Sequence, residues 1–171
     1  VVVGNGYNSI AGKAVLYVLF VTGGDDGTWT VGTDYVKLVA HTGSGNGLST
    51  PAAFDSNGNG LIDTIYAGDL KGNLWKFDVS NSSTSNWNVA LGGAPLFVSG
   101  TSKPIIAPPS ISFHPKGGRL VLFGTGKYLE TADTTSTNTQ TIYGVWDNNT
   151  AATVTADALV QQVMTDGTTR T

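Results

Sequence analysis

The chain has 171 residues, of which 40% are hydrophobic and 12% are charged, a balance that excludes a disordered chain and allows a sizeable core. Its net charge is -3 and its Lys and Arg residues form no cluster, so neither nucleic acid nor an anionic membrane surface is expected as a partner. Cysteine is absent, which excludes disulfides and thiolate metal sites, and no apolar run approaches the ~20 residues of a membrane span.

Strand-forming residues open the chain. We expect Val1–Gly4 to be a strand and, after a glycine turn, Ala14–Val21 to be a buried strand, because this run is rich in β-formers. The chain begins with Val, carries no signal-peptide pattern and starts directly on strand residues. We therefore interpret it as a piece of a longer polypeptide.

The segment after Phe54 has an oxygen-bearing side chain at every second position, which is the ligand spacing of a calcium loop. Gly60 stands at position 6, where an EF-hand loop makes its sharp turn. A hard cation prefers such oxygen ligands, so Ca²⁺ is the expected ion. The predicted ligands, at positions 1, 3, 5, 7 and 9, are Asp55, Asn57, Asn59, the backbone carbonyl of Leu61, and Asp63.

This segment differs from an EF-hand in two respects. Tyr66 stands at position 12, where an EF-hand has a bidentate Glu, and the flanking residues are typical of strands rather than helices. We expect an EF-hand-like loop on a β scaffold, with a dissociation constant near the ~10⁻⁴ M of extracellular modules. The alternative is a plain hairpin turn, since Asn, Asp and Gly also favour turns, but turn chemistry does not explain the alternating spacing.

An apolar triplet ending in glycine occurs three times, as Val1–Gly4, Ile65–Gly68 and Val121–Gly124. Each triplet is followed by a second expected strand, which in the later two units is Asn73–Val79 and Thr141–Trp146. A strand, a glycine turn and a further strand, repeated at blade-like intervals, are typical of a β-propeller.

The second and third units also match before the triplet. Phe54 and Phe113 occupy the same place in Pro51–Phe54 and Pro109–Phe113, and each is followed by a turn. The turn is the calcium-type loop in one unit and the short segment His114–Gly118 in the other. The calcium-type loop is therefore predicted to be an elaborated hairpin turn.

We predict an all-β chain, a β-propeller of the quinoprotein-like type with about three blades. The repeat units are expected at residues 1–47, 48–103 and 104–171 of a single propeller domain. Known propellers have at least about four blades, so the chain is expected to be part of a larger propeller, with seven blades as the expected total. Only Thr155–Met164 has helical spacing, with Thr155 or Asp157 as the cap, and this predicts a helix there.

Five segments, in order along the chain, together resemble one known family. The segments are Val1–Asn8, Asp55–Asp63, Tyr66–Ser80, Phe123–Glu130 and Gln140–Asp147. They are similar to the C-terminal β-propeller of the PilC/PilY proteins, the type IV pilus tip-associated adhesins.

The resemblance implies a modified seven-bladed propeller at the cell surface, on the pilus tip, in the periplasm or associated with the outer membrane. It implies that the calcium loop influences pilus extension and retraction, and that the family's ligands fall on the five positions already given. Pilus subunits (pilins) or pilus assembly proteins would be the partners. Adhesion to a host surface would belong to an N-terminal region that these residues do not include.

Two alternatives remain beside a non-enzymatic calcium-binding propeller. The segment Ala67–Asp78 resembles the blade repeat of quinoprotein dehydrogenases, which bind pyrroloquinoline quinone with calcium. That chemistry needs a catalytic Asp and cationic groups facing the cofactor, and no such constellation is evident. Trp75 and Phe77 are more simply the buried face of a strand. The other alternative is a purely structural propeller whose loop binds nothing.

Overall fold

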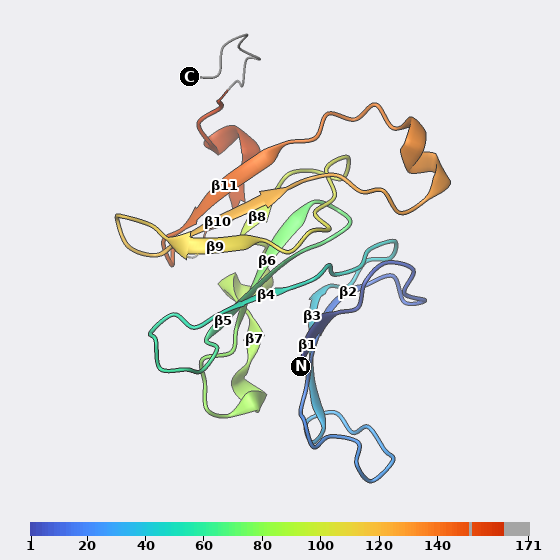
Figure 1. The fold of residues 1–171 in the computed structure, drawn as a ribbon, viewed down its shortest axis with the longest axis vertical. Coiled ribbons are helices and arrows are strands. Elements are labelled where there is room, and N and C mark those ends of the chain that lie inside the picture. Colours follow the sequence, from blue (N-terminus) through green and yellow to red (C-terminus); the bar gives the residue numbers. More distant parts are fainter. Residues whose placement is uncertain (151, 163–171) are drawn as a thin grey trace, which may run out of the picture.

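The structure is a computed structural model that describes residues 1–150 and 152–162. Within these residues the chain is all-β and its strands form three sheets, joined by loops and short 3₁₀ turns (Figure 1). The prediction of an all-β chain is confirmed. None of the described helical segments is long and apolar enough to cross a membrane.

The N-terminal sheet is antiparallel, in the order β1-β2-β3. Its strands are β1 (Val2–Gly4), β2 (Ala14–Leu19) and β3 (Tyr35–His41). The strand predicted over Ala14–Val21 exists but ends at Leu19, and Val21 is 93% exposed in the following turn. The first half of β2 is buried, whereas its C-terminal half is only partly buried, with Val18 packed against the edge of the core.

The central sheet holds six strands in the order β12-β8-β6-β5-β4, with β7 paired to β6. The strands are β4 (Ala52–Phe54), β5 (Thr64–Gly68), β6 (Asn73–Asp78), β7 (Asn88–Val89), β8 (Phe97–Val98) and β12 (Val154–Thr155). All pairs are antiparallel except β12 with β8. This parallel pair joins segments from two of the expected repeat units.

The third sheet is antiparallel, in the order β11-β10-β9. Its strands are β9 (Ser110–Phe113), β10 (Arg119–Gly124) and β11 (Ile142–Asp147). Along β11 the exposed and buried residues alternate strictly, as expected for a strand with one face against the core. The turn between β9 and β10 is the one predicted at 114–118.

The central sheet lies between the other two sheets, and both of its faces are buried (Figure 1). Successive residues of β5 point to opposite faces, so Ile65 and Ala67 pack toward the N-terminal sheet while Tyr66 packs toward the third sheet. Trp75 and Phe77 belong to the first of these cores, and their predicted core role is confirmed. Sheets stacked face to face in this way are the packing expected of propeller blades.

The helix predicted over Thr155–Met164 is wrong in the part of the chain that is described. Thr155 belongs to β12, residues Ala156–Ala158 form a single 3₁₀ turn, and no regular structure follows up to residue 162. The backbone at the start of this segment takes part in sheet pairing instead of a helix, because the Val154 amide donates a hydrogen bond to the Leu96 carbonyl at 2.8 Å. A short helix is marginal without tertiary packing, whereas sheet pairing satisfies these groups at once. Met164, the end of the predicted helix, lies outside the described residues.

The remaining 3₁₀ turns of the described residues are η1 (Thr84–Asn86), η2 (Leu91–Gly93) and η3 (Thr131–Thr135).

The repeated triplet glycines have different surroundings, and this predicts different effects of mutation. A Cβ at Gly68 would lie 2.3 to 2.4 Å from atoms of Ile105, whereas a Cβ at Gly124 would meet nothing within 4 Å. We expect Gly68→Ala to lower the free energy of unfolding by about 1–3 kcal/mol, as overpacking does. Gly124→Ala, the matched control on β10, is expected to change it by less than about 1 kcal/mol. Urea unfolding measures both, and equal losses would contradict the close approach at Gly68.

Candidate metal centre

Residues 55–63 form the loop that joins β4 to β5, so the prediction of an elaborated hairpin turn is confirmed. The hairpin is closed by the antiparallel pair Phe54 and Thr64 and by the Asp63 amide, which donates to the Phe54 carbonyl at 3.1 Å. The loop projects from the end of the central sheet, on the same side as the β9–β10 turn (Figure 1). We call it the β4–β5 loop.

In the first half of the loop, side-chain oxygens accept hydrogen bonds from backbone amides further along the chain, and these bonds fix the turn. Asp55 Oδ1 accepts from the Gly58 amide at 2.7 Å and from the Asn57 amide at 3.2 Å. Its Oδ2 accepts from the Gly60 amide at 2.7 Å. Gly60 has φ +85°, a left-handed conformation that glycine adopts without strain, so the sharp turn lies where the spacing placed it.

The two asparagines repeat the same motif one step further on. Asn57 Oδ1 accepts from the Asn59 amide at 3.0 Å, and Asn59 Oδ1 accepts from the Leu61 amide at 2.8 Å. The alternating oxygens are thus successive Asx-turns, in which each side chain fixes the backbone two residues on. Every Asx oxygen in this series is held close to the main chain.

Asp63 closes the loop and is the most buried of the predicted ligands, with 8% of its surface exposed. Its Oδ2 accepts from the amide and the hydroxyl of Ser56, at 2.8 and 2.5 Å. Its Oδ1 faces the Asn57 side-chain nitrogen at 3.4 Å. The structure therefore brings the side chains of Asn57 and Asp63 together across the loop.

The donor chemistry of the loop fits a hard cation. A carboxylate has roughly four acceptor sites and an amide oxygen two, and the hydrogen bonds described leave capacity on each of the four side chains. Within the described loop, the Leu61 carbonyl accepts no hydrogen bond. No three His, Cys, Asp or Glu side chains gather around one point in residues 1–150 and 152–162, so a cation here depends on amide and carbonyl oxygens.

Asp55 is ionised across the neutral pH range. The Gly60 amide, with smaller contributions from other loop amides, holds the pKa of Asp55 below its ordinary value of 3.8. A carboxylate in this state carries the charge that a divalent cation requires.

A cavity of about 570 Å³ lies beside the loop. The loop contributes Asn57, Asn59 and Asp63 to its wall, while the N-terminal sheet contributes Val2 and Val18. Further lining residues come from the segment after β6, including Trp87. The loop therefore has one side against a hollow between two sheets, and Leu61, which also lines this hollow, is 69% exposed.

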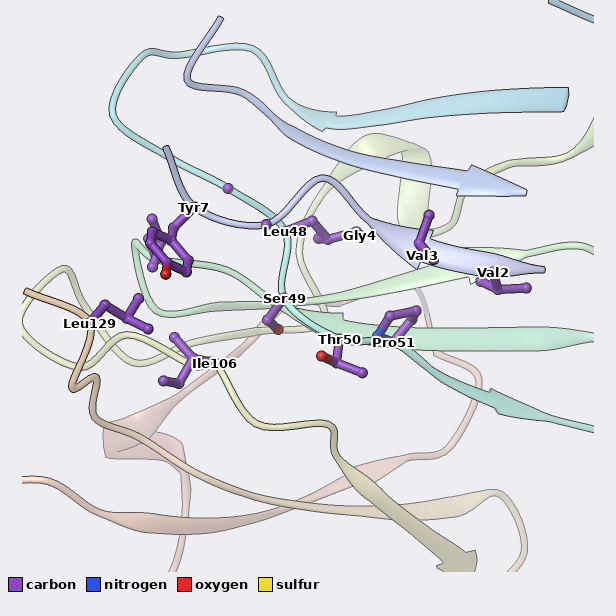
Figure 2. A pocket seen from close by; sticks show the side chains of 13 residues that line it. Val2, Val3, Gly4, Tyr7, Leu48, Ser49, Thr50, Pro51, Ile106 and Leu129 are labelled. Atoms are coloured by element: carbon purple, nitrogen blue, oxygen red, sulfur yellow. The ribbon is translucent and has the colours of Figure 1, made fainter. Parts of the chain in front are cut away.

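A second cavity, of about 370 Å³, lies between the N-terminal sheet and the segments that follow β3 and β8 (Figure 2). Figure 2 shows Tyr7, Ile106 and Leu129 among its lining side chains. None of its lining residues within 1–150 and 152–162 is charged, so these residues do not supply the catalytic carboxylate and cationic groups that a quinone cofactor would need.

Two polar residues that connect the loop and the sheets were not predicted from the sequence. Ser56 was overlooked because it falls between the alternating ligands, although its hydroxyl contacts Asp63. Asp147 is 2% exposed and accepts from the Tyr66 hydroxyl and from Lys76 Nζ, both at 2.6 Å. The only sequence signal was an Asp ending a strand with strict alternation, which does not identify its partners.

Comparisons with known proteins relate the chain and its fold to one family. A family model described as the PilY1 beta-propeller domain matches residues 1–170. A type IV pilus biogenesis factor PilY1 of Pseudomonas aeruginosa is 38% identical over 173 residues, which cover 88% of this chain and 14% of that protein. A type IV pilus biogenesis factor PilY1 homolog of Xylella fastidiosa is 34% identical over 178 residues, which cover 94% of this chain and 12% of that protein.

A solved structure is similar as well. The crystal structure of the Pseudomonas aeruginosa PilY1 C-terminal domain aligns with a TM-score of 0.76 and 36% sequence identity. The alignment covers 90% of this chain and 36% of that domain. The chain therefore spans about a third of the solved domain and about a seventh of the full-length relative.

Proposed function

The chain belongs to the PilY1 β-propeller family, and on this premise we propose that its β4–β5 loop is a calcium site in a type IV pilus biogenesis factor. The observation that carries the proposal is the series of Asx-turns in which each oxygen holds an amide and keeps capacity for a cation. The ligands would be Asp55, Asn57, Asn59, the Leu61 carbonyl and Asp63.

The residues of the loop would supply charge, neutral oxygen ligands and a sharp turn to the ion. Asp55 and Asp63 supply the two formal charges, the asparagines add neutral oxygens, and Gly60 provides the turn that allows one short segment to surround a cation. Bound Ca²⁺ would supply positive charge that offsets the repulsion between the two carboxylates. The loop would then be fixed in one conformation.

A fixed loop would offer a contact surface to pilus subunits or pilus assembly proteins. Leu61 and Ile62, in the second half of the loop, are 69% and 41% exposed and would be presented in a defined position only when the loop is ordered. We propose that external calcium in this way regulates pilus extension and retraction at the cell surface. We assign no adhesion to a host surface to this chain, which covers 14% of its Pseudomonas aeruginosa relative.

Calorimetric titration of the protein with CaCl₂ tests the proposal. We expect a dissociation constant of about 10⁻⁴ M and much weaker binding of Mg²⁺, which demands a rigid octahedral site and dehydrates reluctantly. At a calcium concentration about a hundredfold above this constant, the protein gains about 2.7 kcal/mol of stability. Binding persists at mildly acidic pH, since the pKa of Asp55 lies below 3.8. No heat and no shift in unfolding temperature at about 10 mM calcium would overturn the proposal.

A further inference from the structure

Arg119 belongs to the third sheet, yet its side chain reaches the β4–β5 loop of the central sheet. It begins β10, where it lies opposite Phe113 of β9 and Asp147 of β11. Its Nη2 donates to the Ser56 carbonyl at 2.7 Å, a contact between residues 63 positions apart. Its Nη1 donates to the Gly118 carbonyl at 2.9 Å.

Two aromatic rings hold the guanidinium in place. The guanidinium carbon lies 4.7 Å from the ring centroid of Phe54 and 4.6 Å from that of Phe113, within the range of cation–π contact. The rings themselves meet edge to face, with centroids 5.6 Å apart. These are the two phenylalanines at matching places in the second and third repeat units, and Phe54 directly precedes the first loop ligand.

The orientation of Arg119 is set by these contacts. Its Nε is buried and has no hydrogen-bond partner among the described residues, so the side chain does not lie where all of its N–H donors would be satisfied. The terminal nitrogens aim at two backbone carbonyls and the planar group lies against two rings. Arginine suits such a site because its fork of donors is rigid and planar.

Ser56 connects this contact to the calcium loop. Its carbonyl accepts from Arg119, while its amide and hydroxyl both donate to Asp63 Oδ2. Moving the Ser56 backbone would therefore move the donors that orient Asp63. The path from β10 to the buried ligand consists of three hydrogen bonds through one residue.

We infer that Arg119 is a positioning residue for the β4–β5 loop, which couples the calcium site to the packing of the third sheet against the central sheet. The inference rests on the proposed calcium site. The charge of Arg119 by itself would lower calcium affinity, because a fixed positive charge near the loop repels a divalent cation. A purely electrostatic Arg119 would weaken calcium binding, whereas a positioning Arg119 strengthens it.

Calorimetric titration with CaCl₂ of Arg119→Gln separates the two roles. We expect its dissociation constant to rise about three- to tenfold over wild type, the size typical of mutations in a coupling network. Arg119→Lys keeps the charge and a donor but not the planar fork, so an intermediate value is expected. Lys116→Gln, which removes one exposed charge from the same β9–β10 turn, is the charge control and is expected to leave binding unchanged or slightly tighter.

The unfolding temperature of each calcium-free variant, measured separately, distinguishes loop positioning from a general loss of fold. Arg119→Lys serves as the test variant if Arg119→Gln does not fold. Unchanged or tighter binding in a folded Arg119 variant would overturn the inference while leaving the calcium site intact. Absence of calcium binding by the wild-type protein would overturn the site itself and, with it, this role of Arg119.

Discussion

Replacing Asp147 with alanine is expected to lower the free energy of unfolding by about 3–5 kcal/mol. The carboxylate is 2% exposed and lies between the third sheet and the central sheet. It accepts from Lys76 Nζ and the Tyr66 hydroxyl, both at 2.6 Å, and from the Asn149 amide at 3.0 Å. Its removal leaves a buried hydroxyl without its acceptor and a largely buried ammonium with only the neutral Asn149 Oδ1, at 3.0 Å, as a partner. That cost exceeds the gain from losing one desolvated charge.

Urea unfolding measures the effect, with Lys127→Gln as the control. Lys127 pairs with Asp133 at 2.6 Å, but its side chain is 30% exposed, so solvent screens the interaction and only a small loss is expected. Tyr66→Phe removes the hydroxyl alone and is expected to cost about 1–3 kcal/mol. A loss at Asp147 no larger than that at Lys127 would contradict the role of the buried cluster.

The same cluster gives the stability of the protein a dependence on pH. Burial raises the pKa of Asp147, but the hydrogen bonds from Lys76 and Tyr66 outweigh it and hold the pKa below the ordinary value of 3.8. Because the folded-state pKa is depressed, this contribution is fully present above pH 3.8 and is lost as the pH falls through the lower folded-state value. The urea midpoint of the wild type is therefore expected to fall more steeply in acid than that of the Asp147 variant.

Replacing Asp63 with alanine is expected to raise the calcium dissociation constant by at least about a hundredfold, which places it beyond calorimetric detection. The substitution removes one of the two formal charges of the site, and charge count is a main determinant of affinity in such loops. It also leaves the amide and hydroxyl of Ser56 without the acceptor that orders the loop. The circular dichroism of the sheets should stay nearly unchanged, since the Asp63 backbone bonds to Phe54 and Val79 remain.

Asp78→Ala is the matched control for Asp63. Asp78 lies opposite Thr64 at the end of β6, and it too accepts from the amide and hydroxyl of one serine, Ser80, at 3.0 and 2.6 Å. It is exposed and not a predicted ligand. We expect its removal to change calcium affinity by less than about threefold, the effect of a screened charge. Similar losses in both variants would show that net charge, not ligation, determines binding.

Local patterns in the sequence were sufficient for the loop and most strands. The alternating oxygens and Gly60 predicted the position of the turn, because Asx-turns depend only on neighbouring residues. The glycine-ended triplets predicted β1, β5 and β10 for the same reason. The β3 strand was missed although Val36 and Leu38 alternate with exposed positions, a period-two signal that was present in the sequence.

The remaining features depend on contacts between distant segments. The helical spacing of 155–164 was overridden because β8 offers backbone partners to Val154 and Thr155 from 57 positions away. No local signal identified the partners of Arg119 and Asp147, since Ser56 lies in the β4–β5 loop and Tyr66 in the central sheet. No pattern within one strand specifies such pairs, and only the packing of the sheets brings them together.

The most direct test of the calcium site is an electron-density map of crystals of the protein grown in millimolar calcium. We expect an ion in the β4–β5 loop, within about 2.3 to 2.6 Å of oxygens of Asp55, Asn57, Asn59, Asp63 and the Leu61 carbonyl. A well-ordered loop in which water or no density takes that place, under these conditions, would rule out the calcium site.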